Sequence, residues 1–233
     1  MRAALIVLLL TFATQAGAEN KQTNFGGVIL NLPKPDNLCV VENYGSTSEI
    51  FEMQSAIQRK AGNKLLAFYD DCLHLENAIN GSEEANSPEW QFVVAYDPDS
   101  DADAETIFKN YSTQRFNEEI AAGISDLDIN ELFKRAEQGV NQTLKDFSYD
   151  GNIVFGKPID LGVLEIGDAV FQGMIVNISN GNDDFLVGGI FSYLLVNGVF
   201  ISAYKYKKYK SKQTMIDLLS DAKFYVAKVV HLN

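Results

Sequence analysis

The stretch YDDCLHLEN, residues 69–77, is where a nucleophile and a histidine stand close together in this chain. Cys72 and His74 are two residues apart, so they would share a face if the stretch were a strand. A thiolate beside an imidazole could serve a thiol- or histidine-dependent enzyme. Enzymes of that kind, however, bring cysteine and histidine together through the fold and not through sequence adjacency. The pair is therefore a candidate site without a catalytic signature.

Cys39 and Cys72 are the two cysteines of the chain, and they also have a structural interpretation. An even number of cysteines in an exported chain favours a disulfide. Closing a loop of this span is worth about 3.5 to 4 kcal/mol from loop-closure entropy. We predict a Cys39–Cys72 disulfide, and a redox or nucleophilic thiol at Cys72 is the alternative.

The first eighteen residues, MRAALIVLLLTFATQAGA, have the layout of a secretory signal peptide. Arg2 precedes an apolar run, and Ala16 and Ala18 form an A-x-A cleavage pattern. The apolar run is shorter than the roughly 20 residues that a spanning helix needs. We predict that residues 1–18 are removed and that residues 19–233 are exported to the periplasm or the extracellular space as a single domain.

Alternating acids in YDPDSDADAET suggest an oxygen-rich site for calcium on Asp97, Asp99 and Asp101. Counted from Asp97, an EF-hand loop would need glycine where Ala102 stands and glutamate where Phe108 stands. We therefore interpret the stretch as a solvated acidic loop, and a weak calcium site is the alternative.

The sequence contains no G-x-S-x-G, H-E-x-x-H, Walker or dinucleotide-binding motif. Its two histidines, His74 and His231, are far apart, so a multi-histidine metal site is not expected. The sequence therefore indicates no cofactor and no enzyme class.

Five lysines stand within eight positions near the end of an acidic chain, whose formal net charge is −12. That net charge argues against nucleic acid as a partner, because nucleic-acid binding depends on neutralising phosphates. The lysines could instead contact an anionic lipid or lipopolysaccharide surface, or they could protect the end of a strand. The candidate patch consists of Lys205, Lys207, Lys208, Lys210 and Lys212.

Residues 185–204 form an uncharged run that is long enough for a membrane-spanning helix. Asn197-Gly198, however, lies between two β-branched and aromatic runs at the spacing of a two-residue hairpin turn. The alternation continues beyond the apolar run in Tyr204-Lys205-Tyr206-Lys207, which is typical of a strand. We predict a hairpin here, and a membrane-tethered protein is the alternative.

Hydrophobic periodicity divides the chain into a mixed first part and a strand-rich last part. Apolar residues at helical spacing predict four helices, at residues 46–62, 104–111, 129–147 and about 214–230. Apolar runs predict strands at residues 65–70 and 89–96, and hairpin dipeptides divide about 159–207 into a four-strand meander. The predicted fold class is α+β, with an antiparallel sheet packed against helices.

Two stretches carry a resemblance: L-P-K-P-D-N-L-C, and G-N-K-L-L-A-F-Y-D-D-C-L-H-L after the first predicted helix. Over about 45 residues the chain resembles a group of uncharacterised exported proteobacterial proteins with paired cysteines, a resemblance that implies no activity. The late meander followed by a helix is similar to the PsbP/Mog1-type sandwich, which implies a binding or assembly accessory. We therefore expect a soluble, non-enzymatic envelope accessory whose partner is a protein or another envelope component.

Overall fold

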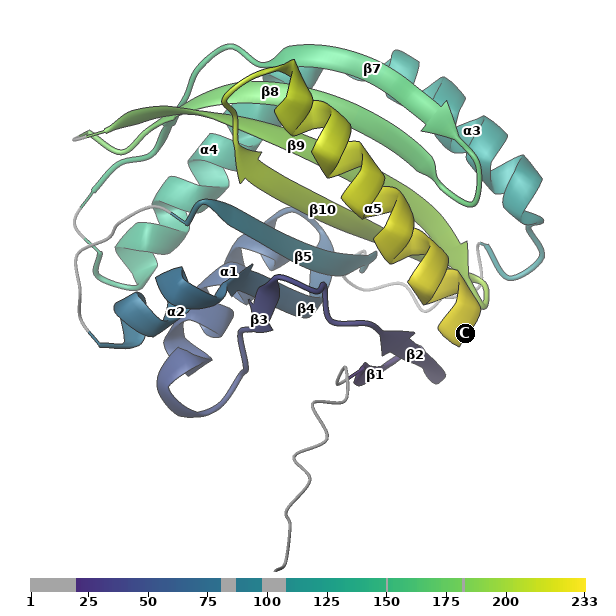
Figure 1. Ribbon diagram of the computed structural model, residues 1–233, viewed down its shortest axis with the longest axis horizontal. Helices are drawn as coiled ribbons and strands as arrows, with labels where there is room; N and C mark the ends of the chain where they lie inside the picture. Colours follow the sequence, from purple (N-terminus) through teal and green to yellow (C-terminus); the bar gives the residue numbers. More distant parts are fainter. Residues whose placement is uncertain (1–19, 81–86, 98–107, 150, 182) are drawn as a thin grey trace, which may run out of the picture.

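An antiparallel sheet of eight strands forms the centre of the computed structural model (Figure 1). The structure describes residues 20–80, 87–97, 108–149, 151–181 and 183–233. The strand order is β3-β4-β5-β10-β9-β8-β6, and β7 pairs with β8 beside β6. These strands are β3 (Leu38–Val40), β4 (Asn63–Asp71), β5 (Glu89–Tyr96), β6 (Val154–Phe155), β7 (Ile159–Ile166), β8 (Val170–Ser179), β9 (Asp184–Val196) and β10 (Val199–Lys208).

The predicted four-strand meander is confirmed as β7 to β10, each strand antiparallel to the next. Val196 pairs with Val199 across the Asn197-Gly198 turn, and both turn residues have positive φ. This is the backbone conformation that a two-residue hairpin requires. Residues 185–204 are thus strand and turn, and no helix in the described ranges is long and apolar enough to cross a membrane.

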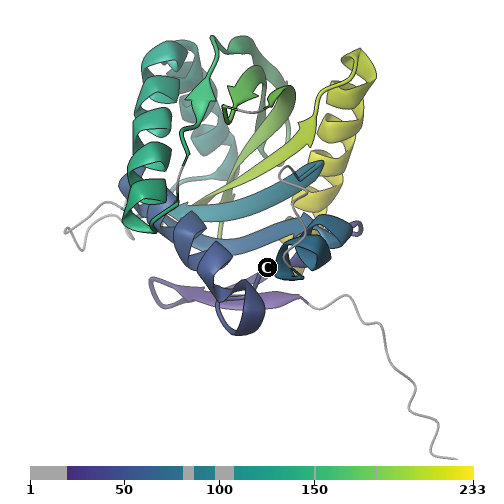
Figure 2. The ribbon, with the colours of Figure 1, turned by 90° about the vertical axis from the view of Figure 1, so that its left-hand side faces the viewer.

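Helices cover both faces of the sheet, and Figure 2 shows α5 and α4 on opposite sides of it. Ile190, Leu194 and Ile201 lie in the same buried cluster as residues of α5. Phe191 and Tyr204 point the other way and pack near Ile129 of α4. Both faces of the β9–β10 hairpin are therefore apolar because both are covered. The helices are α1 (Ser48–Lys60), α2 (Cys72–Ile79), α3 (Thr113–Ser125), α4 (Ile129–Asp146) and α5 (Lys212–Leu232).

The last helix confirms the predicted one and is longer. It begins at Lys212 because the Ser211 hydroxyl accepts a hydrogen bond from the Gln213 N–H, and Thr214 completes a capping box. Thr214, predicted as the start, is therefore the third helical residue.

The prediction of a helix at residues 104–111 is wrong for the part that the structure describes. Residues 104–107 lie outside the described residues, and Phe108 to Asn110 form a turn. Helix α3 starts afterwards, at Thr113, because the Ser112 hydroxyl accepts from the Arg115 N–H. Phe108 is still half-buried, and its ring contacts those of Phe116 and Phe200.

A separate hairpin of β1 (Lys21–Phe25) and β2 (Val28–Leu32) packs against the end of α5. The Asn31 N–H donates to Asn233 Oδ1 at 2.9 Å, and Asn233 Nδ2 donates to the Asn31 carbonyl at 2.9 Å. Leu30 of this hairpin shares one apolar core with Leu218 of α5. The predicted signal peptide, residues 1–18, lies outside the described residues.

Candidate functional site

The predicted disulfide between Cys39 and Cys72 is present, with a Cα–Cα distance of 4.9 Å. Cys39 lies on β3, which pairs with the end of β4 through Leu38 and Asp71. Cys72 is the first residue of α2, directly after β4. The bond therefore joins an edge strand of three residues to the junction of β4 and α2. Because its sulfur is bonded to Cys39, Cys72 offers no thiol to a substrate.

Cys72 and His74 lie on a helix, which corrects the strand geometry expected for them. The reason is Asp71, whose carboxylate accepts hydrogen bonds from the Leu73 and His74 N–H groups, both at 3.0 Å. An aspartate at this position is a preferred N-cap, and this is the signal that the sequence analysis missed.

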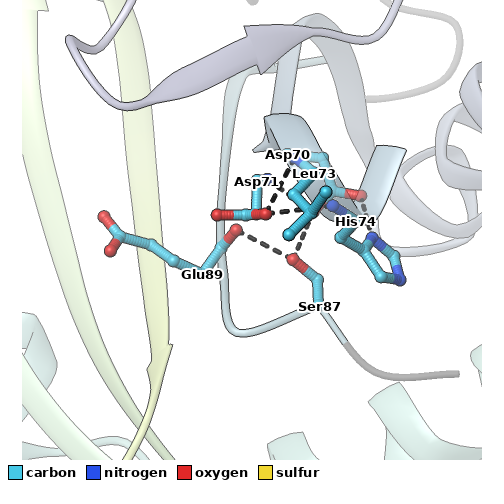
Figure 3. A network of polar contacts seen from close by, with 6 residues as sticks. All are labelled: Asp70, Asp71, Leu73, His74, Ser87 and Glu89. Atoms are coloured by element: carbon cyan, nitrogen blue, oxygen red, sulfur yellow. Dashed lines mark hydrogen bonds and ion pairs between the residues drawn. The ribbon is translucent and has the colours of Figure 1, made fainter. Parts of the chain in front are cut away.

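His74 belongs to a network of polar contacts with Asp70 and Ser87 (Figure 3). Its Nδ1 lies 2.7 Å from Asp70 Oδ2, and since a carboxylate only accepts, Nδ1 carries the proton. Asp70 Oδ1 accepts from the Asp71 N–H at 2.9 Å and from the Ser87 hydroxyl. The Ser87 hydroxyl also lies 2.9 Å from the Glu89 carbonyl oxygen. Figure 3 shows the Glu89 side chain pointing away from this network.

The network orients the His74 imidazole as a general base requires, but Ser87 does not stand where a serine nucleophile would. In a serine nucleophile site the hydroxyl bonds to the imidazole, whereas Ser87 bonds to the carboxylate. Asp70 is 4% exposed, so its hydrogen bonds satisfy a charge that would otherwise be buried without partners. The arrangement ties the end of β4, the first turn of α2 and the start of β5 together.

The five lysines of the predicted patch do not share one environment. Lys205 and Lys207 leave the same face of β10, and both pair with Glu89, at 2.6 and 2.7 Å. Lys205 also lies 3.8 Å from Asp221 of α5 and is only 6% exposed. Burial raises the pKa of Glu89, yet the two lysines outweigh burial and the pKa lies below its ordinary value. These two lysines therefore belong to an ion cluster on Glu89, in which Lys205 is buried and Lys207 is partly exposed, and not to a free basic surface.

The other three lysines of the patch are exposed. Lys208 ends β10, Lys210 lies in the connection, and Lys212 begins α5. Within the described parts of the chain, none of the three has a carboxylate within ion-pair distance. They form a small basic corner where β10 leads into α5.

The calcium candidates fall mostly outside the described residues, where Asp99 and Asp101 are located. Asp97 follows β5 and is exposed. Among the residues that the structure describes, no three histidine, cysteine, aspartate or glutamate side chains gather closely enough to hold a metal ion.

Cavities open on the described surface in at least two places. One, of about 200 Å³, lies between the β1–β2 turn and the β9–β10 turn and is lined by aromatic rings such as Phe25 and Phe200. Another, of about 70 Å³, lies beneath α5, with Gln91 and Lys205 among its lining residues. His74 lines neither of them.

Comparison with known proteins adds no identity to this geometry, since no family model matches the chain and no curated protein is significantly similar to it.

Proposed function

We propose that this protein is an exported accessory of the bacterial envelope that acts by binding and not by catalysis. The observation that carries the proposal is that the fold uses the side chains capable of catalysis for structure. Cys72 is bonded to Cys39, and Asp70 holds both His74 and the Ser87 hydroxyl. The disulfide supports export, because such bonds persist in oxidising compartments.

The basic corner of Lys208, Lys210 and Lys212 is the proposed contact with an anionic envelope surface. Its three ammonium groups are exposed on a chain whose net charge is −12. Attraction between exposed charges extends over about 8 Å at physiological salt and about 3 Å at 1 M. Binding to anionic lipid or lipopolysaccharide through this corner is therefore weak and sensitive to salt.

Co-sedimentation of the mature protein with vesicles of anionic and of neutral lipid tests the contact. The triple variant Lys208→Gln, Lys210→Gln, Lys212→Gln should lose binding to anionic vesicles at low salt. A control variant with the same change in charge replaces three exposed lysines elsewhere, Lys134, Lys145 and Lys157. Equal losses in both triple variants would show that net charge alone governs binding, and no binding by the parent protein would remove the lipid contact.

Export and catalysis are tested separately. Fractionation with N-terminal sequencing should find the mature chain outside the cytoplasm, beginning after Ala18, and non-reducing peptide mapping should recover the Cys39–Cys72 bond. A cytoplasmic full-length chain would refute export. A hydrolytic activity that is lost in His74→Ala, in a variant that remains folded, would refute the non-enzymatic proposal.

A further inference from the structure

Strand β7 forms part of one edge of the sheet, and Figure 1 shows it along the outer margin. It pairs with β8 on one side, and no described strand pairs with its other side. Within the described parts of the chain, the backbone of residues 159–166 bonds to no backbone group outside the pair with β8. An open edge of this kind is a template for pairing with another strand.

The side chains of β7 are unusually exposed for an apolar strand. None of its eight residues is buried, whereas every other described strand of eight or more residues has at least five buried residues. Apolar surface gathered in this way on a folded protein marks a site of interaction. Four large apolar side chains of the strand are between 38% and 57% exposed: Ile159, Leu161, Leu164 and Ile166.

Charged residues at the two ends of β7 have opposite signs. Lys157 precedes the strand and Asp168 follows it, and both are exposed. Neither has an ion-pair partner among the residues that the structure describes. Two copies of β7 that run antiparallel bring the basic end of each to the acidic end of the other, whereas parallel copies bring like charges together. This charge complementarity favours a second copy of the chain, related by a twofold axis, as the partner.

The register that sets Lys157 opposite Asp168 also matches the apolar residues of the strand. Apolar side chains directly opposite each other stabilise an antiparallel pair. In this register the axis passes between residues 162 and 163, Ile159 lies opposite Ile166, and Leu161 lies opposite Leu164.

The irregular positions of β7 obey the same symmetry. Bulges often protect an edge from pairing, and β7 has them at Leu161 and Leu164. The twofold axis relates these two positions, so both copies depart from regular geometry at matching places. Asp160 would lie opposite Glu165, but each carboxylate has partners in its own chain. Asp160 accepts hydrogen bonds there, and Glu165 pairs with Lys223 at 2.7 Å.

We propose that the outer edge of β7 pairs with β7 of a second copy of this chain, antiparallel to it, so that the two sheets become continuous across a twofold axis. Eight residues at about 3.4 Å each give a paired edge of about 27 Å. An interface of this size is weak, and the dimer forms in a concentration-dependent way. The edge includes none of the lysines of the basic corner, so the dimer does not depend on the proposed lipid contact.

Sedimentation equilibrium of the mature protein, disulfide intact, from about 10 µM to about 1 mM tests the dimer. Because the chain has a net charge of −12, the measurement is made at physiological salt, where charges more than about 8 Å apart are largely screened. The parent protein should pass from monomer to dimer in this range. In nitrogen-15 NMR spectra of the same dilution series, the backbone amides of residues 159–166 should shift with concentration.

Ile159→Lys should weaken the dimer by about tenfold or more, because it places a charge against Ile166 twice in each dimer. Ile79→Lys is the matched control, since Ile79 is 44% exposed on α2, which packs beside β3 and β4 at the other side of the sheet. This control should leave the affinity within about twofold of the parent.

A charge exchange tests the antiparallel arrangement without changing any apolar residue. Lys157→Asp should weaken the dimer, because two like-charge contacts replace two attractions. The double variant Lys157→Asp, Asp168→Lys should return the affinity to within about threefold of the parent. Both residues are exposed, so the variants keep the fold. The vesicle assays are run where the parent is a monomer, because their control variant also changes Lys157.

Four results would overturn the proposal. They are a monomer throughout the concentration range, an affinity unchanged in Ile159→Lys, an equal loss in Ile79→Lys, and a double variant no tighter than Lys157→Asp. The first would leave the edge to a strand of another protein, and the second and third would place self-association on another surface. The last would exclude the antiparallel register.

Discussion

Replacing Glu89 by glutamine should be among the most destabilising single changes to a charged residue in this protein. The Glu89 carboxylate lies 2.6 Å from Lys205 Nζ and 2.7 Å from Lys207 Nζ. Glu89 is 9% exposed and Lys205 is 6% exposed, so both charges lie away from water. Glutamine keeps the size of the side chain and removes its charge, which leaves the Lys205 ammonium with Asp221 alone, at 3.8 Å.

Removing one partner of a buried ion pair costs about 3 to 5 kcal/mol. We expect a loss of about 3 kcal/mol in the free energy of unfolding for Glu89→Gln, at the low end because Asp221 still faces Lys205. Lys207→Gln is the matched control, since this side chain is 40% exposed and its pair with Glu89 is worth about 1 kcal/mol or less. The double variant Glu89→Gln, Lys205→Met should recover most of the loss because it leaves no buried charge unpaired.

The contacts of Glu89 with the two lysines also predict that the free energy of unfolding depends on pH. The lysines hold the pKa of Glu89 below its ordinary value of 4.5 in the folded protein, although burial raises it. A group whose pKa is lower when folded stabilises the protein above its unfolded pKa. The contribution of Glu89 is therefore complete above about pH 4.5 to 5 and disappears as the pH falls through the folded pKa. Glu89→Gln should remove this part of the acid sensitivity.

Urea unfolding, followed by the fluorescence of Trp90, measures these differences in the free energy of unfolding. Trp90 lies on β5, next to Glu89. In the Glu89→Gln variant the free energy of unfolding should fall with urea concentration at the same slope, while the urea concentration at the midpoint decreases. An unchanged slope with a lower midpoint indicates a change in stability and not in the surface exposed on unfolding. If Glu89→Gln and Lys207→Gln lose the same small amount, or if the double variant is weaker than Glu89→Gln, the buried-pair reasoning is refuted.

Three further predictions concern other contacts. Cys39→Ser with Cys72→Ser should lower the free energy of unfolding by about 4 kcal/mol, because the bonded cysteines are 33 positions apart in the chain; a reducing agent should then have no further effect on urea unfolding. Ser87→Ala should cost about 1 to 2 kcal/mol in the same assay, because buried Asp70 loses a donor, and no loss would mean that this contact is not stabilising. Gly198→Ala should lower the melting temperature through a cost of about 1 to 2 kcal/mol, since φ is +82° and a Cβ would stand 3.2 Å from Lys109 Cα; an unchanged melting temperature would contradict it.

The meander, the helix at residues 129–146 and the last helix could be predicted because their signals are local. Asn197 and Gly198 tolerate positive φ, which both the hairpin turn and its register need. Asp128 precedes α4, where its carboxylate accepts from the Glu131 N–H, so a cap and an apolar stripe agree. The disulfide was predictable for a simpler reason, because two cysteines allow a single intramolecular pairing.

The environment of each lysine and the partners of His74 were decided by the tertiary structure. Burial of Lys205 depends on β5 lying beside β10, strands that more than a hundred residues separate in the chain. The same adjacency puts Gln91 next to Lys205, and no local pattern shows it. His74 meets Asp70 because Asp71 starts a helix at Cys72, although an isolated helix of eight residues is marginal without tertiary packing. Sequence determines such elements through short-range hydrogen bonds and periodicity, whereas a site built across strands exists only after distant segments have paired.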